Sequence, residues 1–161
     1  MRIAIAADHV GFELKEKLKT FLEHLGHEVK DFGAYEFDPS DDYPDFIMPA
    51  ARAVGSGEVE RAIVIGSSGQ GEGIVANRIK GARALVYYGN VDPLPESHKT
   101  GPSVDLITSS REDNDSNILA LGASFVSLED SELVVQRWLE TPFTAEERHK
   151  RRIQFLDSTP S

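Results

Sequence analysis

Apolar residues gather in short runs along the chain, and these runs alternate with stretches of helical spacing. The runs are typical of buried strands, which we expect at residues 2–7, 61–66, 83–88 and 117–122. Residues 28–32, EVKDF, are expected to form a further strand. Strands that alternate with helices along a chain predict a parallel sheet with right-handed crossovers and helices on both of its faces. The pattern therefore predicts an α/β fold.

Helices are predicted where apolar residues recur three and four positions apart, as they do on one face of a helix. The clearest example stops at Gly26, and its apolar face comprises Leu14, Leu18, Phe21, Leu22 and Leu25. Pro44 suits the first turn of the next helix. Further helices are expected at residues 72–80, 131–140 and 144–157. Thr144 and Glu147 form a capping-box pattern at the start of the last one.

One segment departs from this alternation. Residues 89–110 are rich in Pro, Gly and Ser and are longer than a usual connection, which indicates a loop insertion at about 90–109. The insertion is either a functional lid or a mobile loop, and the sequence leaves both interpretations open. Because no repeat or linker divides the chain, residues 1–161 are expected to form a single domain.

The charge of the chain limits its partners. A formal net charge of −10 argues against nucleic acid and anionic membranes as partners, so a basic cluster must hold any anionic ligand. The absence of cysteine excludes disulfides, thiolate metal sites and a cysteine nucleophile. The first apolar run is too short for a signal peptide and is broken by Asp8, so a cytoplasmic location is expected.

Candidate chemistry is expected at one edge of the sheet, because open parallel sheets bind ligands outside the carboxyl ends of their strands. Asp8 and His9 follow the first strand, and the stretch VIGSSGQGEGIVANR, residues 64–78, contains the end of the third. We also expect the polar residues 111–117, before the fifth strand, at this edge. Asp8 either caps the following helix or holds a ligand, and His9 is either a surface residue or a ligand-binding one.

The stretch at residues 64–78 places small residues where a strand gives way to a helix. It lacks the Gly-Lys-Ser/Thr of a Walker A loop and the glycine spacing of a dinucleotide-binding loop. Its backbone N–H groups form a natural cradle for an oxyanion at a helix N-terminus. Glu72 either complements the helix dipole there or acts as a general base. Ser68 either caps the loop or relays a proton.

A basic run, RHKRR, occupies residues 148–152 of this acidic chain. Arg148 and Arg152 are four positions apart and so share one helical face. The run is either a solvated charged face, in which Glu147 pairs with Arg151, or a phosphate site with two guanidinium groups. It is too short and isolated to indicate nucleic-acid binding.

Five motifs occur in this order and spacing: DHVGFELK, DYPDF, IVIGSSGQGEGIVANRIKGARA, NDSNILALG and RHKRR. Through nearly its whole length the chain thereby resembles the type B ribose-5-phosphate isomerases and the related galactose-6-phosphate isomerase subunits. The resemblance implies a Rossmann-like three-layer α/β/α sandwich with a five-stranded parallel sheet. It also implies a homodimer whose active sites are shared between subunits.

The implied reaction is aldose–ketose isomerisation of ribose 5-phosphate and ribulose 5-phosphate through an enediolate, with neither a metal nor an organic cofactor. Two alternatives stay open. One is isomerisation of a six-carbon sugar phosphate such as allose or galactose 6-phosphate. The other is a sugar-phosphate-binding protein without catalysis.

The resemblance also assigns residues. Asp8 would hold a substrate hydroxyl or the ring oxygen, His9 would lie at the phosphate end, and Tyr43 would line the sugar pocket. Arg148 and Arg152 would clamp the phosphate, in the site of the other subunit. The loop that would bind substrate through its backbone comprises Gly66, Ser67, Gly69, Gln70 and Gly71.

Ser68 matches the family's Ser/Thr, which relays a proton between substrate oxygens. Asn114 would contact the sugar hydroxyls. Some members place a cysteine base at the end of the third strand, where this chain has Gly66. Others use a glutamate, and Glu72 falls on that position. The resemblance therefore favours Glu72 as the base.

Two positions depart from the family's pattern. The histidine that commonly precedes the asparagine, and opens the sugar ring, is replaced by Asp113, which would have to stay protonated to do so. Alternatively His98 folds over the site from the insertion and opens the ring, or it is an exposed loop residue. Ser124 stands where some members have another phosphate-binding arginine.

Overall fold

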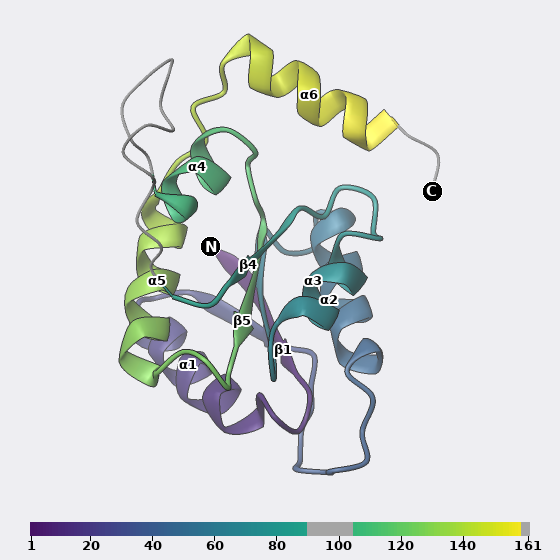
Figure 1. The fold of residues 1–161 in the computed structure, drawn as a ribbon, viewed down its shortest axis with the longest axis vertical. Coiled ribbons are helices and arrows are strands. Elements are labelled where there is room, and N and C mark those ends of the chain that lie inside the picture. The colour runs from purple at the N-terminus through teal and green to yellow at the C-terminus, as the bar shows by residue number, and fades with distance from the viewer. Residues whose placement is uncertain (90–104, 159–161) are drawn as a thin grey trace.

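The computed structural model describes residues 1–89 and 105–158, which fold around a five-stranded parallel sheet (Figure 1). The strands are β1 (Arg2–Ala7), β2 (Glu28–Asp31), β3 (Arg61–Gly66), β4 (Ala84–Tyr87) and β5 (Ile118–Gly122). Their spatial order is β2-β1-β3-β5-β4, and every neighbouring pair is parallel. The predicted α/β fold is confirmed.

Helices cover both faces of the sheet (Figure 1). They are α1 (Phe12–His24), α2 (Pro44–Gly55), α3 (Gln70–Ala76), α4 (Leu106–Glu112), α5 (Leu128–Glu140) and α6 (Glu147–Ser158). Helices α1, α4 and α5 lie on one side and α2 and α3 on the other, so the three-layer arrangement is also confirmed. Within residues 1–89 and 105–158, no helix has both the length and the apolar character that crossing a membrane requires.

The core is divided by the sheet, because successive side chains of a strand point to opposite faces. Large side chains such as Ile3, Ile63 and Leu119 pack against α1 and α5, together with the fully buried Trp138. The face toward α2 and α3 carries smaller residues, among them Ala4, Ala6, Ala62 and Ala120. Small side chains there allow α2 and α3 to pack close to the strand ends.

Helix α4 was not predicted, since residues 105–110 fell within the expected connection. The helix is set by Asp105, whose carboxylate accepts hydrogen bonds from the backbone N–H groups of Ile107 and Thr108, both at 3.1 Å. Such a cap satisfies N–H groups that a helix start leaves without partners. Residues 90–104 of the expected insertion, including His98, lie outside the described part of the chain.

The capping box predicted for α6 is wrong. Thr144 turns instead toward α4, where its hydroxyl and its backbone N–H both donate to the carbonyl oxygen of Glu112, at 2.7 and 3.3 Å. Helix α6 begins three residues later, at Glu147. It lies beyond the amino ends of the strands, at the top of Figure 1.

Candidate active site

Two carboxylates meet at the carboxyl ends of β1 and β3, which are neighbouring strands. Asp8 directly follows β1 and is buried. Its Oδ1 accepts hydrogen bonds from the backbone N–H groups of Val10 and Gly11, both at 3.0 Å. Asp8 therefore caps the turn into α1, and the two hydrogen bonds fix its side chain at the edge of the sheet. Its contact with substrate stays a prediction.

Glu72 lies in the first turn of α3, and its side chain turns inward rather than to solvent. The residue is only 4% exposed. Its carboxylate lies over Gly66 at the end of β3: a Cβ built at Gly66 would overlap this group and come within 2.7 Å of even its farther oxygen, Oε2. Burial, together with the negative charge of Asp8, raises the pKa of Glu72 above its ordinary value. A carboxylate withdrawn from water is a stronger base.

The loop between β3 and α3 is shaped by its glycines and by one hydrogen bond of Ser68. Gly69, the N-cap residue of α3, has a φ of +73°, in the left-handed region that favours glycine. The hydroxyl of Ser68 accepts a hydrogen bond from the N–H of Gln70 at 3.3 Å, which supports the interpretation that Ser68 caps the loop. A Cβ at Gly71 would come within 2.9 Å of the Tyr43 ring. Tyr43 therefore lies against the loop, and its contact with the sugar stays a prediction.

Ser124, after β5, is bonded to Ser67, after β3. Its hydroxyl lies 3.0 Å from that of Ser67, and its N–H donates to the Ser67 carbonyl, also at 3.0 Å. These bonds couple the turn after β5 to the loop after β3. Ser124 thus helps to hold the loop after β3 in its conformation.

His9 is held by a residue that the sequence analysis did not name, Asp41. The Nδ1 atom of His9 lies 2.6 Å from Oδ1 of Asp41, which also accepts the backbone N–H of His9 at 3.2 Å. The hydrogen bond with Asp41 raises the pKa of His9 above its ordinary value of 6.5. A protonated imidazole at this edge is suited to an anionic ligand. The only sequence signal was the acidic run at residues 38–42.

We expect Asp41→Asn to lower the pKa of His9 toward 6.5, as measured by NMR titration of the imidazole ring protons. A raised histidine pKa stabilises the fold fully below pH 6.5, and this stabilisation is lost as the pH rises through the folded-state pKa. The difference in thermal stability between wild type and Asp41→Asn should therefore shrink at higher pH. An unchanged His9 titration would contradict the assignment of Asp41.

The segment at residues 111–117 does not lie where it was predicted. It precedes β5, and in a parallel sheet the residues before a strand lie at the opposite edge from those that follow its neighbours. Asp113 and Asn114 are therefore at the amino ends of the strands, across the sheet from Asp8 and Glu72. The placement of this segment with the other two was wrong.

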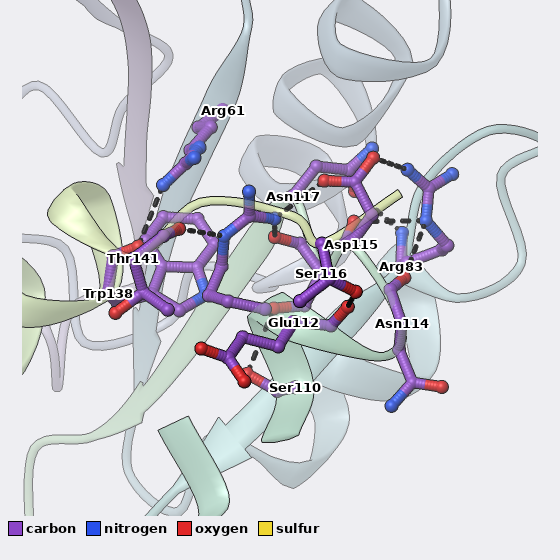
Figure 2. Close-up of polar contacts among 12 residues, drawn as sticks. Arg61, Arg83, Ser110, Glu112, Asn114, Asp115, Ser116, Asn117, Trp138 and Thr141 are labelled. Atoms are coloured by element: carbon purple, nitrogen blue, oxygen red, sulfur yellow. Dashed lines mark hydrogen bonds and ion pairs between the residues drawn. The ribbon is translucent and has the colours of Figure 1, made fainter. Parts of the chain in front are cut away.

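A dense polar network holds this turn in place (Figure 2). The Arg83 guanidinium donates to the Asn114 carbonyl at 3.1 Å and to the Asp115 carboxylate at 2.9 Å. Arg111 donates to the other oxygen of Asp115 at 2.8 Å. Figure 2 shows the Asn114 side chain pointing away from this network. Its backbone is therefore fixed, while its exposed amide donates to the Ser109 carbonyl at 3.4 Å. The contact of Asn114 with sugar hydroxyls stays a prediction.

Helix α6 brings the two arginines to the same end of the molecule as Asp113. Arg148 and Arg152 are exposed, and Nε of Arg148 donates to the Glu146 carboxylate at 2.8 Å. The side chain of His149, between them in the sequence, lies against Asp113. The structure thus divides the predicted residues into two groups at opposite edges of the sheet. One contains Asp8, His9, Tyr43, Glu72 and residues 66–71, and the other contains Asp113, Asn114, Arg148 and Arg152.

Comparison with known proteins identifies the family to which this sequence belongs. A model of the ribose/galactose isomerase family matches residues 3–91 and 103–156. The chain belongs to the ribose/galactose isomerase family. Ribose-5-phosphate isomerase B of Escherichia coli is 36% identical over 155 residues, which cover 96% of this chain and 93% of that protein. The Mycobacterium tuberculosis protein of the same name is 33% identical over 156 residues, 97% of this chain and 88% of that protein.

Solved structures of the ribose/galactose isomerase family superpose closely on this fold. Ribose-5-phosphate isomerase B of Clostridium thermocellum gives a TM-score of 0.83 at 39% identity, over 98% of this chain and 95% of that one. The Mycoplasma genitalium enzyme, solved with bound ribulose-5-phosphate, gives 0.82 at 30% identity, over 97% and 93% of the two chains.

Proposed function

We propose that the chain is a type B ribose-5-phosphate isomerase, which interconverts ribose 5-phosphate and ribulose 5-phosphate through an enediolate. The names of its relatives support this proposal, as does the ribulose-5-phosphate bound in the Mycoplasma genitalium structure. The observation that carries it is the buried carboxylate of Glu72, which lies over Gly66 at the carboxyl edge of the sheet with a raised pKa.

In the proposed mechanism Glu72 takes the proton from C2 of the open-chain aldose. The electron pair of that C–H bond forms the C1–C2 double bond of the enediolate, and the π pair of the C1 carbonyl moves onto its oxygen. The backbone N–H groups of residues 67–71 stabilise the negative oxygen. Ser68 relays the hydroxyl proton from the C2 oxygen to the C1 oxygen. Glu72 then returns its proton to C1, and C2 becomes the carbonyl carbon of ribulose 5-phosphate. One carboxylate serves both carbons because they are neighbours.

The function is tested by assaying the purified protein with ribose 5-phosphate, ribulose 5-phosphate, allose 6-phosphate and galactose 6-phosphate. The proposal expects turnover of the two five-carbon substrates. Turnover of a six-carbon substrate alone would replace it with the hexose phosphate alternative. Binding of these compounds without turnover would identify a sugar-phosphate-binding protein.

We further propose that the active enzyme is a homodimer in which each site draws on both subunits. Glu72 and the Arg148–Arg152 pair lie at opposite edges of one chain, so a single substrate reaches both groups only if a second copy supplies one of them. Helix α6 also exposes apolar side chains, with Phe155 74% and Leu156 61% exposed. Exposed apolar surface of this kind is typical of an interface between subunits.

Complementation between two inactive variants tests the shared site. Glu72→Gln lacks the base, and the double variant Arg148→Ala/Arg152→Ala lacks the phosphate clamp. In a mixed dimer one site carries both defects and the other is intact, so random pairing during co-expression should restore about a quarter of wild-type activity. Activity no greater than the sum of the two separate variants would contradict a site built from two chains.

A further inference from the structure

His149 is a buried imidazole for which the described fold supplies no hydrogen bond. It lies in the first turn of α6 and is 3% exposed. Among residues 1–89 and 105–158, neither Nδ1 nor Nε2 has a hydrogen-bond partner. Buried polar atoms are nearly always paired, so an unpaired one calls for an explanation, of which a catalytic role is one kind. The proposed isomerisation mechanism does not use this side chain.

The connection between α5 and α6 determines what His149 faces. Arg111 donates to the Thr141 carbonyl at 3.1 Å, and Thr144 is bonded to Glu112, so this connection is tied to α4 at two points. These bonds bring the first turn of α6 over the end of α4, where Asp113 is the C-cap residue. The Nε2 atom of His149 lies 3.4 Å from Oδ1 of Asp113.

Asp113 connects this buried imidazole with the exterior. Its side chain is 41% exposed, so the carboxylate contacts His149 while remaining accessible from outside. The carboxylate of Glu146 is also near the ring, but it lies farther away at 3.9 Å and accepts a hydrogen bond from Arg148. Asn114 and Arg148, both proposed to bind substrate, are the immediate neighbours of Asp113 and His149 in the sequence. The Asp113–His149 pair thus lies among the proposed sugar and phosphate contacts.

Isomerisation requires a step that the Glu72 chemistry does not provide. Ribose 5-phosphate is mainly a closed furanose, and its C2 proton becomes acidic only after the ring opens to an aldehyde. Opening breaks the bond between C1 and the ring oxygen, which must receive a proton. An exposed carboxyl group is ionised at neutral pH and has no proton to give, whereas an imidazole gains and loses a proton in this range.

We propose that Asp113 and His149 form a proton-carrying pair that opens the sugar ring. Asp113 touches the substrate, and His149 is a positioning residue that acts through it; this inference rests on the proposed isomerase function. The pair holds one proton, which Asp113 delivers to the ring oxygen as the bond to C1 breaks. The hydroxyl on C1 becomes the aldehyde and loses its proton to water, which returns one proton to the pair.

Ribulose 5-phosphate offers a test that separates ring opening from the later chemistry. Its O5 is esterified, so it cannot form a furanose ring and is always open. The experiment compares two readouts for His149→Gln: the initial rate with ribose 5-phosphate, and the wash-in of solvent deuterium at C1 of ribulose 5-phosphate. We expect the first to fall about a hundredfold and the second to stay within about twofold of wild type. A merely structural role would lower both equally.

Two further variants examine the pair itself. Asp113→Asn, at a partly exposed position, should reproduce the selective loss without disturbing the buried ring. Asp113→His combined with His149→Gln should recover turnover of ribose 5-phosphate, because an imidazole at position 113 carries its own proton. His24→Gln, at the exposed end of α1, is the matched control and should leave both readouts unchanged.

The outcomes distinguish this inference from the proposed function. A wild-type protein that neither isomerises ribose 5-phosphate nor exchanges deuterium into ribulose 5-phosphate would refute the isomerase itself. With an active wild type, the pair is refuted in three cases: His149→Gln turns over ribose 5-phosphate normally, it lowers both readouts equally, or the combined variant is as slow as His149→Gln. Selective loss followed by recovery in the combined variant supports the pair.

Discussion

Glu72→Gln should lower kcat for ribose 5-phosphate by about a hundredfold to ten-thousandfold, the range expected when a general base is lost. Glutamine has nearly the same volume as glutamate, so it fills the buried space over Gly66, but it cannot accept the C2 proton. Substrate should still bind, since the arginines and the loop are untouched. Steady-state kinetics and calorimetric titration with ribose 5-phosphate measure the two effects separately.

Because the pKa of Glu72 is raised, Glu72→Gln should also change the pH dependence of thermal stability. Because burial favours the protonated carboxyl, ionisation of Glu72 destabilises the fold as the pH rises through its raised pKa. Glu72→Gln should therefore melt at a higher temperature than wild type at neutral pH, and the difference should vanish at acidic pH. The acid limb of the wild-type pH–rate profile should lie above pH 4.5, the ordinary pKa of glutamate.

A matched control separates catalysis from the effect of a first-turn carboxylate on a helix. Glu129 also lies in the first turn of its helix, α5, but it is exposed. Glu129→Gln should leave kcat unchanged and alter stability only slightly. A Glu72→Gln variant with near-normal kcat would exclude Glu72 as the base and leave dipole complementation as its role.

Gly66→Ala should lower turnover about a hundredfold or more, although it adds only one methyl group. The added Cβ would occupy the place of the Glu72 carboxylate, which must then leave its position over the strand end. The φ of Gly66 is outside the left-handed range, so alanine fits the backbone of β3 and the protein should fold. Kinetics, together with circular dichroism to verify folding, measure this effect.

A double-mutant cycle identifies the cause of the Gly66→Ala defect. If the methyl group acts only by displacing Glu72, adding Gly66→Ala to Glu72→Gln should produce almost no further loss of kcat. If the loss of kcat in the double variant equals the product of the losses in the two single variants, Gly66→Ala acts independently of Glu72, for example by contacting the substrate. Near-normal turnover of Gly66→Ala alone would show that the carboxylate does not need this space.

The part of the fold that follows from local pattern was predictable. All five strands were predicted to within about one residue at each end. Apolar runs marked β1, β3 and β5, because a strand buried on both faces tolerates few polar side chains. Helix α4 was missed because residues 105–110 follow a Pro- and Gly-rich stretch, while the helix depends on one cap at Asp105. Asp8 and Glu72 were identified because they lie beyond the carboxyl ends of neighbouring strands.

The remaining site residues depend on contacts between distant segments. Asp113 was assigned to the wrong edge because its segment leads into β5 rather than out of it. Asp41 was hidden in an acidic loop, and only the return of that loop toward β1 makes it the partner of His9. His149 looked like one residue of a basic surface run, and its burial arises from the bonds that fold residues 141–146 onto α4. No periodicity in the sequence encodes such contacts.

The shared space at Gly66 and Glu72 also constrains how this enzyme can evolve. A descendant with its catalytic base at the end of β3 would need a side chain in place of Gly66. That substitution alone would displace the carboxylate of Glu72. Loss of Glu72 first would leave no base at all. Each single step therefore crosses a fitness valley, so a lineage that has adopted one base is expected to keep it over long periods.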